Sequence, residues 1–587
     1  MDRQLLTFKK KYNTQIEEKE KINKILSNIR IIIFLIFITL LIACRNDLSN
    51  IKFLLIFLAI SFIIVAICHK KVKEDKKRLS IGLDIIRKYE SRSNNKWKEK
   101  DDETLTIIPS KNSADFMIDL DIIGKSSLFQ FLNFTKSKGG AQNLLDVMSL
   151  ENVTKDNILA NQEAIEELKN NFNFILSFQE EMSEIEDIEN IDFKEYLYLF
   201  KGKKENKKTE LIVSCLISLV TIITFVLTIQ NVIKPYFFLG LFFLQIISSH
   251  LYTFIYNNEF STISKCAKKF SKLQKVYDYI KNQNFESKKN KNLQHNIIEG
   301  RKTLKRLIDI SSYDSCRYNF VTNTIFNVFF SLDFIILYKY MNLLNKESKS
   351  FETSIKAIEE LETLISLSTV CLVKEKTCKP IVKDNLCINI SNMKHPLLDE
   401  NDCISNSFEC ERDINIITGS NMSGKTSFMK TIGTNLVLAY TGTFVNAESF
   451  SCSIMKMFTS INVKDDINNG ISTFYGELQR IKKVLEFSKK SKEPIIVFID
   501  EIFKGTNYND RILGAKETLK KLSMINCIVF LTTHDFELCE ISNKKVHNYH
   551  FAEFYKENKI FFDYKIKTGK CTTTNAKYLM KKMRIID

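Results

Sequence analysis

The stretch that decides the fold is DINIITGSNMSGKT, residues 413–426. Its first part, Asp413–Thr418, is typical of a buried strand, and an amphipathic helix pattern follows Thr426. Between them, Gly419–Thr426 fits the pattern GxxxxGK[ST] in the strand–loop–helix setting that this pattern requires. There the glycines let backbone N–H groups surround phosphates, and the helix N-terminus adds a favourable dipole. The sequence therefore predicts a phosphate-binding loop in an α/β domain.

The loop residues have separate expected roles toward ATP and Mg²⁺. We expect the ammonium of Lys425 to reach the β and γ phosphates and the hydroxyl of Thr426 to ligate Mg²⁺. The other residues expected to contact the nucleotide are Gly419, Ser420, Asn421, Met422, Ser423, Gly424 and Ser427.

A second strand supplies the expected acidic residues. Pro494–Asp500 (PIIVFID) is a continuous apolar run, which is typical of a central parallel strand buried on both faces. Its carboxyl end is where such sheets place their chemistry. We expect Asp500 to belong to the Mg²⁺ shell and Glu501 to orient or deprotonate the attacking water.

A third predicted strand, Cys527–Thr532 (CIVFLT), ends just before His534. A histidine at this strand end can sense or polarise a γ-phosphate. The alternative is a structural histidine with no part in the chemistry. Its position next to the other two strands favours the first interpretation.

Four blocks of this region resemble the ATPase domain of the MutS family of DNA mismatch-repair proteins, within the ABC-type ATPases. They occur in the family's order and spacing, and the segment MKHPLL (Met393–Leu398) before them resembles the family's lead-in. The four blocks are Thr418–Phe450, Asp465–Ile481, Phe498–Arg511 and Thr533–Leu538. Weaker similarities to the helical core, the levers and the dimer-supporting tail are Asp119–Met148, Asn161–Leu168, Glu360–Ser368 and Thr568–Lys582.

The resemblance implies a homodimer that sandwiches two nucleotides. Ser472 would then face the γ-phosphate bound by the other subunit, Asn507 would lie in a segment that crosses the interface, and His534 would be the switch histidine. Two loop positions depart from the family, because Ser420 and Ser423 stand where Pro and Gly are usual. Both changes keep the amides that face the phosphates. No aromatic side chain for stacking on adenine could be assigned.

Four apolar runs predict two membrane hairpins. The runs Leu211–Ile229 and Tyr236–Tyr256 reach the roughly 20 residues of a spanning helix. The runs Ile31–Cys44 and Phe53–Cys68 are shorter and need snorkelling flanks or a thinned bilayer. Pairs of buried core helices are the alternative. Lysine-rich flanks predict a multi-pass protein of the cell membrane with both termini and the ATPase domain in the cytoplasm.

Charge and cysteine content agree with this placement. The net charge of +16 is compatible with DNA or an anionic membrane surface, although a general bias toward lysine explains it too. The 14 cysteines form no CxxC pair, which argues against zinc and disulfide frameworks and favours a reducing compartment. No cleavable signal peptide is expected.

The predicted fold is mostly α, with an α/β ATPase domain at the C-terminal end. Residues 1–110 form a cytoplasmic segment with the first hairpin (31–68) and a linker. Residues 111–380 form a helical core and lever region that the second hairpin (211–256) interrupts. Residues 381–587 form the ATPase domain with its tail.

Two functional hypotheses remain open. Family members that read mismatches carry an N-terminal recognition domain with a Phe-x-Glu wedge, and the core-like sequence here begins near residue 115, so recognition by that wedge is not expected. The first hypothesis is a membrane-anchored MutS-like ATPase coupled to DNA binding or a repair-related process. The alternative is a membrane-associated switch or remodelling ATPase that no longer binds DNA. A transporter and a nuclease are disfavoured, and no small-molecule substrate besides ATP is expected.

Overall fold

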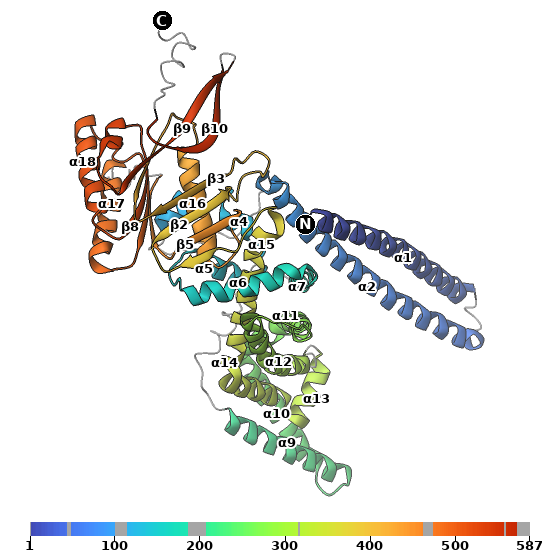
Figure 1. Ribbon diagram of the computed structural model, residues 1–587. Helices are drawn as coiled ribbons and strands as arrows, with labels where there is room; N and C mark the ends of the chain where they lie inside the picture. Colours follow the sequence, from blue (N-terminus) through green and yellow to red (C-terminus); the bar gives the residue numbers. More distant parts are fainter. Residues whose placement is uncertain are drawn as a thin grey trace.

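The computed structural model describes residues 2–43, 48–99, 114–185, 207–314, 317, 319–461, 473–556 and 559–571. Within them, long helices lead to a C-terminal α/β region (Figure 1). The predicted combination of a mostly helical part with a C-terminal α/β part is confirmed. The predicted linker near residues 100–113 and most of the predicted tail lie outside the described residues.

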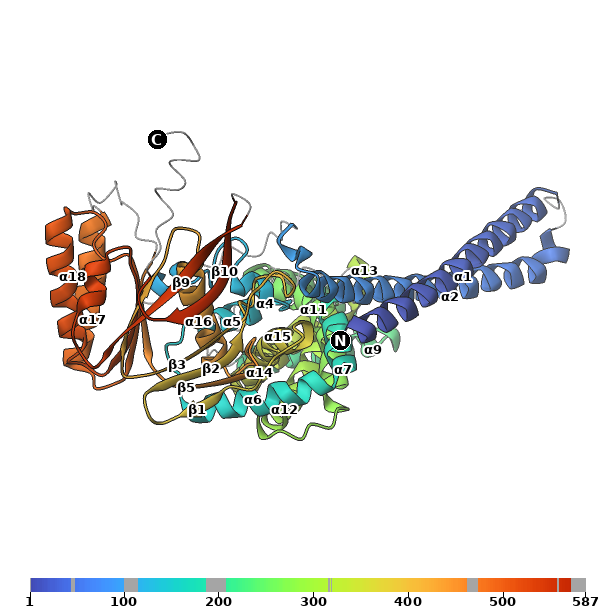
Figure 2. The ribbon, with the colours of Figure 1, turned by 45° about the horizontal axis from the view of Figure 1, so that its top comes forward.

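The first hairpin consists of α1 (Asp2–Ala43) and α2 (Leu48–Ser93). It projects away from the rest of the molecule in both views (Figures 1 and 2). Near its base Lys9 Nζ lies 2.6 Å from a carboxylate oxygen of Glu90, and farther out Lys19 pairs with Asp75 at 2.6 Å. Both helices are long and apolar enough to cross a membrane, and their most apolar windows are 0% buried.

Short helices connect this hairpin to the rest of the core. They are η1 (Lys96–Glu99), α3 (Ala114–Asp119), α4 (Leu128–Leu132), α5 (Lys138–Met148), α6 (Lys155–Asn170) and α7 (Phe172–Ser183). These helices lie within the part of the chain that was predicted to be a helical core, and amphipathic stretches around residues 144–148 and 158–172 fall within α5, α6 and the start of α7.

The second hairpin, α9 (Lys208–Ile229) and α10 (Pro235–Ile255), packs against a bent helix pair. The bend of 74° separates α13 (Phe320–Phe330) from α14 (Leu332–Leu367). Ser331 stands at the break with φ 52°, and its hydroxyl lies 2.8 Å from those of Ser214 and Ser218. The sequence predicted long helices here but not this break. The helices between the two pairs are α11 (Asn257–Lys281) and α12 (Lys288–Asp314).

Helix α14 reaches from the second hairpin to the α/β region. Near its start Asp333 accepts a hydrogen bond of 2.7 Å from Thr253 of α10. At its other end the carbonyl of Leu367 accepts one of 2.6 Å from Thr443. Helix α15 (Thr369–Val373) then leads into the first strand.

The α/β region contains two sheets. The six-stranded sheet has the order β10-β9-β4-β8-β7-β6, and its strands are parallel except for β10, which pairs antiparallel with β9. The three predicted strands are confirmed as the neighbours β4 (Ile414–Thr418), β8 (Cys527–Thr532) and β7 (Ile495–Asp500). The other strands of this sheet are β6 (Lys456–Ser460), β9 (Val546–Lys556) and β10 (Lys559–Thr568). The second sheet has the order β1-β5-β2-β3, with β1 (Ile381–Lys383), β2 (Cys387–Met393), β3 (Asn406–Glu411) and β5 (Ser449–Ser453).

Helices cover both faces of the six-stranded sheet. Helix α16 (Lys425–Tyr440) packs on one face together with the helical core, and the buried side chains there form one continuous cluster. Helices α17 (Thr473–Lys490) and α18 (Tyr508–Leu522) close the other face with a separate cluster. The short helix η5 (Phe536–Glu540) follows β8. In Figure 2, α17 and α18 lie at the opposite end of the molecule from the first hairpin.

Candidate nucleotide-binding site

The loop between β4 and α16 has the backbone that the sequence predicted. Strand β4 is buried along its length, and the loop leaves it at Gly419. Gly419 and Gly424 have φ angles of 149° and 104°, a region that favours glycine. A Cβ on Gly419 would lie 2.8 Å from the carbonyl oxygen of Phe551 in β9. The glycines therefore let the loop pass close to the neighbouring strand.

Lys425 points back over the loop. Its ammonium donates hydrogen bonds of 2.8 Å to the carbonyls of Gly419 and Ser420 and lies 3.4 Å from Nε2 of His534. Burial lowers the pKa of Lys425, and the charges of Glu501 and Asp500 oppose that shift. The one buried cation of the loop thus stands where phosphate charge would be most stabilised.

Thr426 at the start of α16 and Asp500 at the end of β7 offer oxygen atoms that could act as metal ligands. The Thr426 hydroxyl lies 3.1 and 3.2 Å from the two carboxylate oxygens of Asp500, and the hydroxyl of Thr532 also donates to that carboxylate. A hydroxyl and a carboxylate at this separation fit Mg²⁺, which prefers oxygen ligands and keeps several waters. When bound, Mg²⁺ would neutralise charge on the phosphates.

Glu501 follows Asp500 and holds a positive φ of 53°, which is uncommon for a residue other than glycine. Its carboxylate lies 3.4 Å from Nε2 of His534 and 3.3 Å from Nζ of Lys504. The hydrogen bond from His534 lowers the pKa of Glu501 to about 2; the charge of Lys504 adds to this effect, whereas burial opposes it. The carboxylate is therefore ionised at neutral pH, as a general base must be.

A pocket of about 640 Å³ lies beside the loop. This volume is within the roughly 300–1,000 Å³ typical of small-molecule sites. One side is lined by loop residues that include Ser423, Gly424 and Thr426, and Glu501 contributes to the wall. The lining also includes the half-exposed apolar side chains of Leu398 and Ile404 together with Tyr564. This part of the pocket could not be predicted from the sequence, because its members come from two segments far apart along the chain.

Comparison with known proteins assigns this region to a family. The family model described as MutS domain V matches residues 415–582. The DNA mismatch repair protein MutS of Clostridioides difficile (strain 630) is 31% identical over 233 residues. Residues 415–582 thus resemble domain V of the MutS family. The match covers 38% of this chain and 24% of the relative, so the chain spans about a quarter of the length of that MutS protein.

The loop of this MutS-like region has a contact that the sequence did not reveal. The hydroxyl of Ser420, which stands at the usual proline position, donates to the carboxylate of Glu553 in β9, and both side chains are buried. The two residues are 133 positions apart, so spacing could not predict the pair.

A second unpredicted contact holds the segment after His534. Arg511 in α18 donates to both carboxylate oxygens of Asp535, at 3.0 and 2.8 Å. Such a bidentate pair fixes geometry as well as charge. Both residues lie inside the MutS-like blocks, but nothing in the sequence indicated that they meet.

The predicted residues outside the loop and the strand ends are not gathered around Lys425. Ser472 lies outside the described residues. Asn507 caps α18, where its side chain accepts a hydrogen bond of 3.0 Å from the backbone N–H of Asp510. Gly505 packs against Phe474 at the start of α17, so the two segments expected at a subunit interface adjoin each other. In the loop, Met422 is 85% exposed, and together with Asn421 and Ser427 it lines the same pocket as Lys425.

Proposed function

We propose that the chain is a membrane-anchored ATPase of the MutS family, which binds ATP with Mg²⁺ and hydrolyses it as a homodimer. The observation that carries this proposal is the convergence of Lys425, Glu501 and His534 at one edge of the sheet, with separations of 3.4 Å between His534 and each of the other two. Thr426 and Asp500 stand next to them as oxygen donors for the metal.

Each side chain has a distinct role in the proposed reaction. The loop amides and Lys425 hold the phosphates, and Lys425 exchanges its present carbonyl partners for phosphate oxygens. Glu501 orients the attacking water and accepts a hydrogen bond from it. His534 holds the Glu501 carboxylate in position and senses the γ-phosphate. Catalysis of this kind depends on positioning and charge more than on covalent chemistry.

A second subunit completes the proposed site. In the family arrangement Ser472 of one subunit would face the γ-phosphate bound by the other, and the segment with Asn507 would lie in the same interface. The contact between Gly505 and Phe474 supports this proposal, because it brings both segments to one surface of the domain.

Membrane anchoring is supported by the four long apolar helices. In the most apolar stretches of α9 and α10, 17% of the residues are buried, and in those of α1 and α2 none is. Apolar surfaces of this size are unfavourable when exposed to water. Their lysine-rich flanks favour a cell-membrane protein with the ATPase domain and both termini in the cytoplasm.

The partner of the ATPase cycle is proposed to be DNA, in line with the family and the net charge of +16. The alternative, a membrane switch that no longer binds DNA, is favoured by a specific observation. Helix α14 leads from the nucleotide domain directly to the second hairpin, through the contacts of Leu367 and Asp333. Nucleotide-dependent movement would therefore reach the membrane.

The two candidates are separated by the ATPase rate of the reconstituted full chain with and without duplex, branched and single-stranded DNA. Stimulation by DNA that decreases as salt rises is expected for the DNA-coupled protein. A rate that no DNA changes, at low salt, would contradict DNA coupling and support the membrane switch.

A further inference from the structure

A basic groove lies between α1 and α2, just outside the apolar part of the first hairpin. Its volume is about 540 Å³. The residues that line this α1–α2 groove are Asn23, Lys70, Lys73, Glu74, Lys76, Lys77 and Ser80. None of them belongs to the candidate nucleotide site.

The depth of the groove follows from the helix geometry. The apolar run of α2 ends at Cys68, and the next residue, His69, lies 2.9 Å from Arg30, which directly precedes the apolar run of α1. This pair marks the edge of the apolar zone on both helices. With a rise of about 1.5 Å per residue, Lys70 lies roughly 3 Å and Lys77 roughly 13 Å beyond Cys68. The headgroup region extends roughly 5–8 Å beyond each side of the hydrocarbon core, so the groove opens in that layer at Lys70 and Lys73 and continues beyond it at Lys76 and Lys77.

The charge of the groove is not balanced by neighbouring acids. Lys70, Lys73 and Lys77 are exposed, and their spacing places them on one side of α2. Within the described part of the chain, no acidic side chain lies within 4.0 Å of their ammonium groups. Lys76, in contrast, pairs with Glu20 at 3.4 Å. Three uncompensated ammonium groups therefore face one lining carboxylate, that of Glu74.

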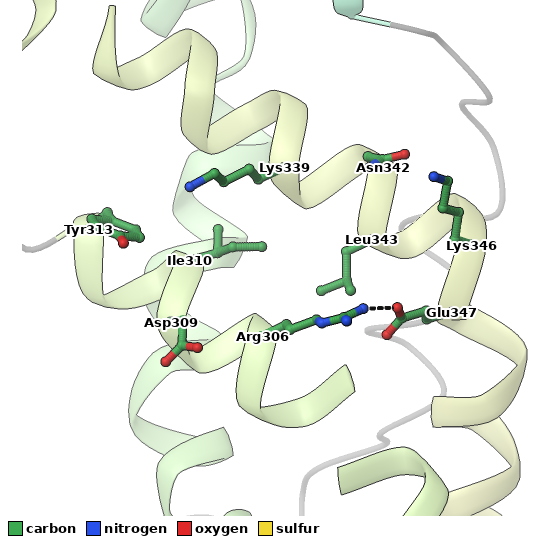
Figure 3. A pocket seen from close by; sticks show the side chains of 9 residues that line it. All are labelled: Arg306, Asp309, Ile310, Tyr313, Lys339, Asn342, Leu343, Lys346 and Glu347. Carbon is green, nitrogen blue, oxygen red and sulfur yellow. Dashed lines mark hydrogen bonds and ion pairs between the residues drawn. The ribbon is translucent and has the colours of Figure 1, made fainter. Parts of the chain in front are cut away.

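A pocket between α12 and α14 provides a comparison. Figure 3 shows that Arg306 faces Glu347, with which it forms an ion pair, and that Lys339 extends toward the ring of Tyr313. Asp309 also lines this pocket. Two carboxylates and one cation–π contact thus compensate most of the positive charge of this pocket. The α1–α2 groove has the stronger unbalanced charge.

We infer that the α1–α2 groove binds the phosphate of an anionic membrane lipid. Clusters of lysines directly beside a spanning helix attract anionic headgroups, and an ammonium is a suitable point-charge partner for a phosphate. The inference rests on the proposed membrane placement of α1 and α2, but not on ATP hydrolysis. A lipid suits this position better than DNA, because the groove opens within the headgroup layer.

The test uses the full chain in phosphatidylcholine vesicles with spin-labelled phosphatidylglycerol or spin-labelled phosphatidylcholine. The electron spin resonance spectrum gives the fraction of each lipid that the protein immobilises. The variant K70Q/K73Q/K77Q removes the groove charges, and K70R/K73R/K77R keeps them. The control K281Q/K288Q/K291Q removes three exposed lysines at the turn between α11 and α12, roughly 37 Å along α11 from the second hairpin.

The wild-type chain, the arginine variant and the control are expected to prefer phosphatidylglycerol, whereas the glutamine variant loses this preference by about 10-fold or more. If inorganic phosphate displaced spin-labelled phosphatidylglycerol as effectively as the unlabelled lipid does, the groove would be a site for free anions, and the lipid assignment would be overturned. If the control variant lost its preference for phosphatidylglycerol to the same extent, the groove would not be the cause. If the glutamine variant lost binding to duplex DNA but kept its lipid preference, DNA and not a lipid would be the ligand. Absence of any immobilised lipid would instead contradict the membrane placement itself.

Discussion

The α/β domain and the helical region of this chain bring their polar side chains together in different ways. In the α/β domain the charged residues follow the ends of adjacent parallel strands, so that Lys425, Glu501 and His534 meet because β4, β8 and β7 lie side by side. In the helical region the decisive polar contacts join distant segments, as with Ser331 and Ser214. Strand order alone gathers the first set, whereas the second depends on how whole helices pack.

The ion pair between Asp119 and Arg480 joins these two regions, and removing its charge should have the largest effect on stability. Asp119 is fully buried, lies 2.5 Å from Arg480 and accepts a hydrogen bond from the backbone of Ile461. Asp119→Asn should lower the free energy of unfolding by roughly 3 kcal/mol, near the lower end for a broken buried pair, because Asp115 still lies 3.7 Å from Arg480. Urea titration in detergent measures this. Asp115→Asn, at the more exposed partner of Arg480, should lower the free energy of unfolding much less. An equal loss in the two variants would mean that burial does not set the strength of the ion pair.

Lys425 tests the nucleotide side of the comparison. Lys425→Ala removes the ammonium at the loop, so ATP should bind roughly 10- to 100-fold more weakly, as expected for a lost hydrogen bond to a charged group. Fluorescent ATP titration measures the dissociation constant. Lys430→Ala is the matched control, since this lysine of the same helix pairs with Asp121 at 2.7 Å. Equal affinity of the two variants would place the phosphates elsewhere.

Gly433 tests how closely α16 packs on the helical core. A Cβ at this position would lie 2.7 Å from Cδ1 of the fully buried Leu120. Gly433→Ala should destabilise the protein by about 1 kcal/mol, because overpacking outweighs the gain in helix propensity. Gly240→Ala, where a Cβ would meet nothing within 4 Å, should not destabilise. The melting temperatures of both variants decide this, and a stabilised Gly433→Ala would show that the two regions pack loosely.

Gln245 tests the polar contacts inside the second hairpin, where the smallest effect is expected. Its side-chain amide donates a hydrogen bond of 2.7 Å to Ser218. Gln245→Leu should cost about 0.6 kcal/mol, the average found for such bonds between membrane helices. Ser248→Ala is a suitable control, because that hydroxyl bonds only within its own helix, to the carbonyl of Gln245 at 3.0 Å. Unfolding in mixed micelles measures the loss of stability. A loss several times larger than this would mean that the hairpin depends on this hydrogen bond as strongly as the core of a soluble protein does on its own.

The same difference explains what the sequence could predict. The strands β4, β7 and β8 are confirmed to within one residue, because continuous apolar runs and the glycine-rich loop are local signals. The break at Ser331 gave no such signal, since its left-handed conformation is held by hydroxyls of α9.

In the candidate site, too, the prediction is limited to contacts that follow from local motifs. The residues on strand ends could be named from their positions in the motifs. The contact of Ser420 with Glu553 could not, because it depends on β9 lying next to β4. The roles of Ser472 and Asn507 stay predictions, since they depend on a second subunit.

The measurement that tests the central claim most directly is ATP turnover by the reconstituted full chain, compared with Glu501→Gln at matched protein concentrations. The variant keeps the loop and Lys425 but removes the carboxylate that lies 3.4 Å from His534. We expect turnover that rises more steeply than linearly with protein concentration, as dimers form, and that falls roughly 10²- to 10⁴-fold in Glu501→Gln while ATP binding persists. Equal turnover by the two proteins, or none by either, would contradict the assignment of this site as an ATPase centre.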